Sequence, residues 1–145
     1  MKKSNLCFIV ALIIGLTLLS CNSECSVEGI DVPETVLISS KEQGINYCEL
    51  LEESLQKEKN SVVKLSLLDF DGSNGYDHGT VLVDLVKKLG ENEYIVFINH
   101  LNTKEKKKIE AYLEVGLMYH YDNGLKEKSL AEIFPRLNSF LNKNQ

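Results

Sequence analysis

Several features that would assign an activity directly are missing from this sequence of 145 residues. It contains no G-x-S-x-G nucleophile motif, no G-x-G-x-x-G dinucleotide fingerprint and no Walker-type phosphate loop. Basic residues are outnumbered, with 16 Lys and Arg against 21 Asp and Glu. An acidic protein does not attract phosphate backbones, so nucleic-acid binding is not expected. The sequence therefore indicates neither an enzyme class nor a bound cofactor.

A hydrophobic run long enough to cross a bilayer is also missing. The longest apolar stretch, residues 6–19, has 14 residues, whereas a spanning helix needs about 20. Lys2 and Lys3 precede this stretch, and Leu18-Leu19-Ser20-Cys21 follows it. A basic start and a short apolar run are typical of a cleaved signal peptide. Residues 1–20 are therefore expected to be an export signal.

The four residues ending at Cys21 resemble the lipobox of bacterial lipoproteins. The resemblance implies that the Cys21 thiol receives a diacylglyceryl group and that signal peptidase II cleaves before it. The protein would then be anchored in the cell envelope by its lipid. Asn22 follows in place of the Asp that retains lipoproteins at the inner membrane, which favours the outer membrane in a diderm source. The alternatives are an ordinary signal peptide cut near Ser20 and an uncleaved anchor.

Two further cysteines, Cys25 and Cys48, remain in the exported part. An even pair in an oxidising compartment is compatible with a disulfide, which would close a 24-residue loop. The alternative is two free thiols. Their spacing is not that of a zinc site, which needs more ligands nearby.

Beyond the cysteines, apolar residues recur with the period of an α-helix. We expect residues 41–145 to form an all-α domain of five or six short, antiparallel helices. The stretch 61–70 and the residues 94–98 also fit strands, although helix is favoured. The expected helix pairs are loosely similar to HEAT-type hairpins in architecture alone. The helix containing residues 94–98 is expected to be central in the packing.

Residues 21–40 are expected to be a lipidated start and a polar tether, with a brief extended patch at 36–38. Cap and turn residues indicate where helices begin and end in the remaining chain. The expected boundary residues are Asp77 and Thr103 as helix caps, Gly90 after a helix, Ser129 and Glu132 as a capping box, and Pro135 as a kink or restart.

The densest polar cluster, residues 69–79, is the candidate ligand or metal loop. Asp69, Asp71, Asp77 and His78 offer oxygen and nitrogen ligands, but the EF-hand pattern fails after its first positions. A turn between helices is the favoured interpretation. His78, His100 and His120 are each expected at a surface or helix end. The acids Asp84, Glu110 and Glu114 are expected to be solvated.

Late in the helix that follows Thr103, aromatic residues suggest an exposed contact surface. Tyr119, His120 and Tyr121 are the candidate interface residues. The sequence thus favours a lipid-anchored, non-catalytic protein-interaction module, of the inhibitor, immunity or assembly type. The alternative is a lipoprotein that binds a metal or small ligand through the Asp69–His78 loop. The expected partners are the membrane and a protein of the envelope.

Overall fold

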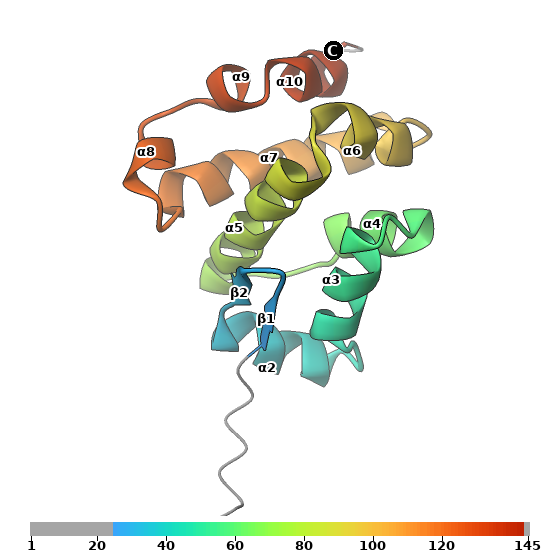
Figure 1. Cartoon of the computed structure of the whole chain (residues 1–145), viewed down its shortest axis with the longest axis vertical. Coiled ribbons are helices and arrows are strands. Elements are labelled where there is room, and N and C mark those ends of the chain that lie inside the picture. Colours follow the sequence, from blue (N-terminus) through green and yellow to red (C-terminus); the bar gives the residue numbers. More distant parts are fainter. Residues whose placement is uncertain (1–24, 144–145) are drawn as a thin grey trace, which may run out of the picture.

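A short β-hairpin precedes a succession of helices in the computed structural model, which describes residues 25–143 (Figure 1). The elements are β1 (Cys25–Val27), β2 (Ile30–Val32), α2 (Glu34–Glu42), α3 (Tyr47–Leu55), α4 (Lys59–Ser66), α5 (Gly72–Leu89), α6 (Glu91–Ile98), α7 (Thr103–Tyr119), α8 (Asn123–Lys126), α9 (Leu130–Ile133) and α10 (Pro135–Asn142). The all-α class is confirmed. The signal peptide and Cys21 lie outside the described residues.

The hairpin occupies chain that was expected to be a loose tether. β1 and β2 pair in antiparallel register, with Cys25 opposite Val32. Glu28 and Gly29 form the turn with φ values of 51° and 80°, the left-handed conformation that two-residue hairpins favour. Ile30 and Val32 are buried, and β2 packs against α5. The tether prediction is therefore wrong from Cys25 onward, because strands of three residues are too short for their alternation to show in the sequence.

A disulfide joins this hairpin to α3. Cys25 in β1 bonds to Cys48 in α3, with their Cα atoms 6.1 Å apart. The bond fixes the start of the described chain to the body of the domain. Chain-entropy arguments assign about 3 kcal/mol to closing a loop of this length.

α2 replaces the extended patch that was expected at residues 36–38. Pro33 precedes the helix with φ −58°, and Glu34 lies in its first turn, where an acid complements the helix dipole. Val36 is the apolar side chain that α2 buries, whereas Ile38 is exposed. One buried apolar residue produces no periodic pattern, so the sequence does not reveal this helix.

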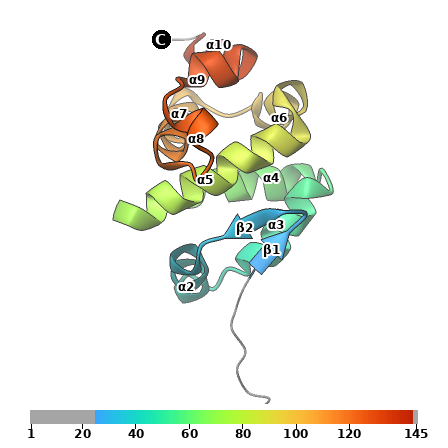
Figure 2. The same ribbon diagram turned by 60° about the vertical axis from the view of Figure 1, so that its left-hand side comes forward.

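α5 is the central helix, and its six consecutive residues 81–86 are all buried. Figure 2 shows it passing between α7–α10 on one side and the hairpin with α2–α4 on the other. The prediction that residues 94–98 form the central element is wrong, although they are helical as favoured: α6 exposes Val96. α5 also begins at Gly72, so Asp77 is an interior helix residue and not a cap.

Capping explains the boundaries in the C-terminal half. Asn102, not Thr103, caps α7 in a capping box with Glu105. The Ser129–Glu132 capping box is confirmed at α9, and Pro135 restarts the chain as the first residue of α10. Among residues 25–143, no helix combines the length and apolar character that a membrane span requires.

Candidate protein-interaction surface and buried polar clusters

Two glycines allow α5 and α7 to cross in backbone contact. A Cβ atom built on Gly116 would lie 2.2 Å from the carbonyl oxygen of Gly79, and one built on Gly79 would lie 2.4 Å from the carbonyl oxygen of Tyr112. No side chain larger than hydrogen fits at either position without moving a helix. The crossing therefore sets which side chains of the two helices meet on the surface.

The crossing brings two tyrosines together at the surface. Tyr76 lies three residues before Gly79, and Tyr119 lies three residues after Gly116. Their rings stack with centroids 4.7 Å apart and planes inclined by 6°. Tyr76 remains 41% exposed and Tyr119 53% exposed. A preformed pair of tyrosines offers apolar area and hydroxyl groups with little loss of side-chain entropy, as binding surfaces require.

A groove of about 650 Å³ begins at Tyr76 and runs between the start of α5 and the outer face of α7. We call it the Tyr76 groove. Its lining residues are Asp69, Phe70, Asp71, Gly72, Gly75, Tyr76, Lys104, Lys107, Lys108, Ala111, Tyr112 and Val115. Those from α7 follow a helical period, so they form one continuous face. The α7 face of the groove is thus basic near the start of the helix and apolar toward Val115, while the segment before α5 contributes Asp69 and Asp71.

Lys108 is held in place at the floor of this groove. Its ammonium group donates to the backbone carbonyl of Leu67 (3.1 Å) and pairs with the Asp69 carboxylate (2.9 Å). The hydrogen bond and charge of Lys108 lower the pKa of Asp69. The Tyr112 hydroxyl accepts from the Phe70 backbone N–H and donates to the Leu68 carbonyl, both at 3.1 Å. These bonds join α7 to residues 67–70, which precede α5.

The predicted ligand loop is not assembled as a site. Asp69 pairs with Lys108, Asp71 precedes α5, and Asp77 accepts a hydrogen bond from the Thr35 hydroxyl. His78 points into the core, where its side chain is fully buried. Within residues 25–143, no three His, Cys, Asp or Glu side chains are placed to hold a metal ion. Helix periodicity explains the separation, because α5 starts at Gly72 and turns its successive residues toward different neighbours.

His78 is enclosed by aromatic rings, so its prediction as a surface or helix-end residue is wrong. Its Nδ1 lies 2.7 Å from the hydroxyl of Tyr47, and the rings of Phe70 and Tyr112 approach within 4.9 and 4.8 Å. Burial lowers the pKa of His78 to about 3, and burial likewise raises the pKa of Tyr47. The imidazole is therefore neutral, and it shares one hydrogen bond with the Tyr47 hydroxyl through Nδ1. Nε2 has no hydrogen-bond partner among the described residues.

A second buried cluster joins α5 to the end of α7 around Asp84, so the prediction that Asp84 is solvated is wrong. Asp84 is almost fully buried, and its carboxylate accepts from the Tyr121 hydroxyl (2.9 Å) and contacts Nε2 of His120 (3.3 Å). Partial burial and the Asp84 carboxylate raise the pKa of Tyr121 to about 12. The sequence does carry a sign of this burial, because Asp84 is the single acid inside the apolar run 81–86. A buried carboxylate must find hydrogen-bond or ionic partners within the protein.

The ring of His120 is occupied at both nitrogens. The backbone N–H of Asp122 donates to Nδ1 at 3.1 Å, so the proton of the neutral ring is on Nε2 and faces Asp84. A general base needs a free nitrogen beside its substrate, and this ring offers none. These two hydrogen bonds give His120 a structural role, because they hold the turn that follows α7 against α5.

The three residues predicted to form an interface differ in their burial. Tyr119 and Tyr121 are exposed, at 53% and 68%, whereas His120 between them is buried. The inclusion of His120 in an exposed interface is therefore wrong. Its side chain points inward because the chain leaves the helical conformation at this residue, with φ −59° and ψ 143°. His100 is exposed in the turn after α6, as expected.

Comparison with protein-family models, with curated proteins and with solved structures finds no match. The groove, the stacked tyrosines and the sequence pattern of the N-terminus are therefore the features that bear on function.

Proposed function

We propose that this protein is a lipid-anchored component of the bacterial cell envelope whose helical domain binds another protein. The binding surface is the Tyr76 groove together with the ring of Tyr119, and the domain acts without catalysing a reaction. The stacked and exposed tyrosine pair is the observation that carries the proposal. The lipobox resemblance at Cys21 supplies the anchor.

The surface chemistry favours a protein partner over a small polar ligand. Isolated exposed apolar residues are normal on soluble proteins, whereas aromatic residues beside a groove suit protein interfaces. Tyr76 and Tyr119 already stack on each other in the unbound protein. These two side chains therefore lose little conformational entropy when a partner covers them. Lys104 and Lys107 at the far end of the groove add positive charge, which favours an acidic or carboxyl-bearing segment of the partner.

The binding proposal is tested by crosslinking and capture from the native envelope, with Tyr119→Ser compared against Val96→Ser. Val96 is an exposed apolar residue of α6, with 59% of its surface accessible, so both changes remove a similar kind of exposed contact. We expect a partner to be captured by the wild type and Val96→Ser and to be depleted at least about tenfold with Tyr119→Ser. Equal capture by both variants would exclude the Tyr76 groove as the contact.

The anchor is tested separately by mass spectrometry of the mature N-terminus and by detergent phase partitioning. We expect a peptide that begins at a diacylglyceryl-modified Cys21, and we expect Cys21→Ser to move the protein into the aqueous phase. An unmodified N-terminal peptide would contradict the anchor and leave the groove to be judged by the capture experiment.

A further inference from the structure

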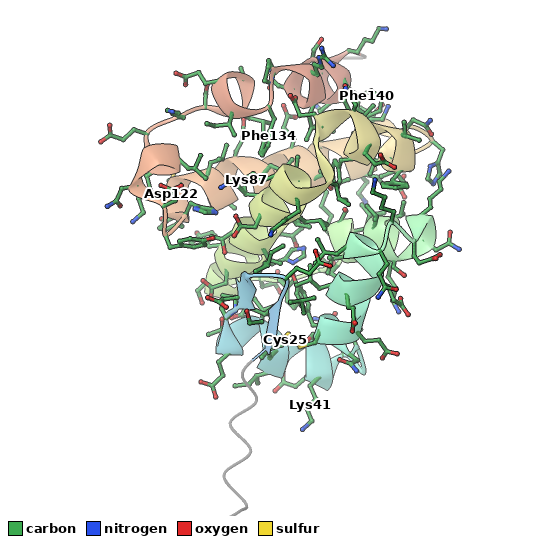
Figure 3. The ribbon with its side chains drawn as sticks, viewed as in Figure 1. Cys25, Lys41, Lys87, Asp122, Phe134 and Phe140 are labelled. Atoms are coloured by element: carbon green, nitrogen blue, oxygen red, sulfur yellow. A yellow bond between two sulfur atoms is a disulfide. The ribbon has the colours of Figure 1, made fainter. Side chains whose placement is uncertain are left out.

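The end of the domain where the described chain begins carries an apolar hollow of about 540 Å³ beside the disulfide. The side chains of α2 and of the following link, Leu37, Ile38, Lys41 and Ile45, line it together with Cys25 and Cys48. We call Leu37, Ile38, Lys41 and Ile45 the basal patch. Figure 3 shows Cys25 and Lys41 at the same end of the molecule, and Figure 1 places α9 and α10 at the opposite end.

Chain length places this end next to the lipid if Cys21 is the anchor. An extended chain advances at most about 3.6 Å per residue, so Cys21 and Cys25 can be no more than about 14 Å apart. Cys25 cannot move away from the domain, because it is paired in β1 and bonded to Cys48. The folded body therefore lacks the long tether that would let it leave the membrane surface.

The basal patch has the chemistry of a membrane interface. Ile38 is 53% exposed although it is a large aliphatic residue. Lys41 is the one charged side chain among the described residues that line the hollow, and no acid is among them, in a chain whose formal net charge is −5. A lysine beside exposed aliphatic residues can extend to lipid phosphates while its neighbours contact the acyl region.

We propose that the basal patch rests in the headgroup region of the bilayer that holds the Cys21 lipid, with Ile38 inserted and Lys41 at the phosphates. α2 then lies against the membrane and α9–α10 face away from it. This inference rests on the proposed lipid anchor and adds a defined orientation of the domain to it. The occupant of the patch is the bilayer surface itself.

Because the chain contains no tryptophan, a single introduced tryptophan is a specific reporter of this contact. Ile38→Trp and Val96→Trp place it at positions with similar exposure, 53% and 59%, in α2 and α6. Each mature lipidated protein is reconstituted into vesicles of phosphatidylethanolamine and phosphatidylglycerol whose acyl chains carry bromine close to the headgroup. Bromine quenches tryptophan fluorescence on contact.

We expect the tryptophan at position 38 to emit at shorter wavelength in vesicles and to be quenched roughly twofold or more. The tryptophan at position 96 should keep its emission and escape quenching. Adding Lys41→Glu to the Ile38→Trp protein should reduce the quenching, whereas Lys59→Glu at the exposed start of α4 should not.

Equal quenching at positions 38 and 96, or none at position 38, with the protein fully bound to vesicles, would overturn the orientation while the anchor stands. A protein that carries no lipid at Cys21 and does not bind the vesicles would overturn both the anchor and the orientation. Quenching at position 38 that Lys41→Glu leaves unchanged would show that the insertion occurs without the lysine, and would overturn its assignment to the phosphates.

Discussion

Replacement of Gly116 by alanine tests whether α5 and α7 are in backbone contact. The added Cβ would lie 2.2 Å from the carbonyl oxygen and 2.3 Å from the carbonyl carbon of Gly79, and 2.9 Å from the backbone nitrogen of Thr80. All three are backbone atoms, so no side-chain rotation relieves the contact. Optimal carbon contacts lie near 3.5 Å, so the helices must separate by about 1 Å, which forfeits a large part of the dispersion energy at the crossing.

The expected loss follows from two opposing effects. Overpacking a core typically destabilises by about 1–3 kcal/mol, and a clash between backbone atoms belongs at the upper end of that range. Alanine is a better helix former than glycine by about 1 kcal/mol, which offsets part of the loss. We therefore expect Gly116→Ala to lower the free energy of unfolding by about 2 kcal/mol.

Urea unfolding followed by circular dichroism measures this change, with Gly124→Ala as the matched control. Gly124 lies in exposed α8, where a Cβ meets a side-chain oxygen of Asp122 at 3.1 Å and no backbone of another helix. The control should stay within about 0.5 kcal/mol of the wild type. Gly79→Ala combined with Gly116→Ala should destabilise less than the sum of the single changes, because one separation accommodates both methyl groups. A Gly116→Ala midpoint at or above the wild-type value would refute the close crossing.

Three further predictions concern the disulfide and the two buried histidines. The double replacement Cys25→Ser, Cys48→Ser should lower the free energy of unfolding by about 3 kcal/mol in urea. Between pH 6.5 and about 3, the unfolded chain protonates His78 and the folded protein does not, so stability should fall with decreasing pH by up to about 1.4 kcal/mol per unit. His78→Gln should remove that part of the slope in pH-dependent urea titrations. Thermal unfolding of Asp84→Leu should show a loss of about 1–3 kcal/mol, because the buried N–H of His120 loses its acceptor, while Asp84→Asn should lose less.

The features that the sequence predicts correctly depend on local interactions. The helix expected after Thr103 and the Ser129–Glu132 capping box each depend on residues within a few helical turns, and both are confirmed. The restart at Pro135 likewise follows from the fixed φ of proline and its missing N–H. Such features can be derived from neighbouring residues without knowing the rest of the fold.

Short elements and burial of polar side chains could not be derived in this way. β2 is recognisable only once α5 covers Ile30, and α2 contributes little more than Val36 to the core. His78 and Asp84 both precede or interrupt an apolar run, yet the sequence analysis placed both at the surface. Their burial depends on partners 31 and 36 residues away, Tyr47 and His120, which no local pattern identifies.

The amino-acid sequence by itself determined the helical character of the chain, several of its caps, and a lipobox resemblance contained in the four residues up to Cys21, because each depends on neighbours along the chain. The tertiary structure alone decided that Gly79 meets Gly116, and so which tyrosines stack beside a groove. It also decided, through the β1–β2 pairing and the Cys25–Cys48 bond, which end of the domain lies beside the start of the described chain. The reason is physical: the packing of two helices depends on the shapes of surfaces far apart in sequence, and a glycine matters there only through the helix that lies against it.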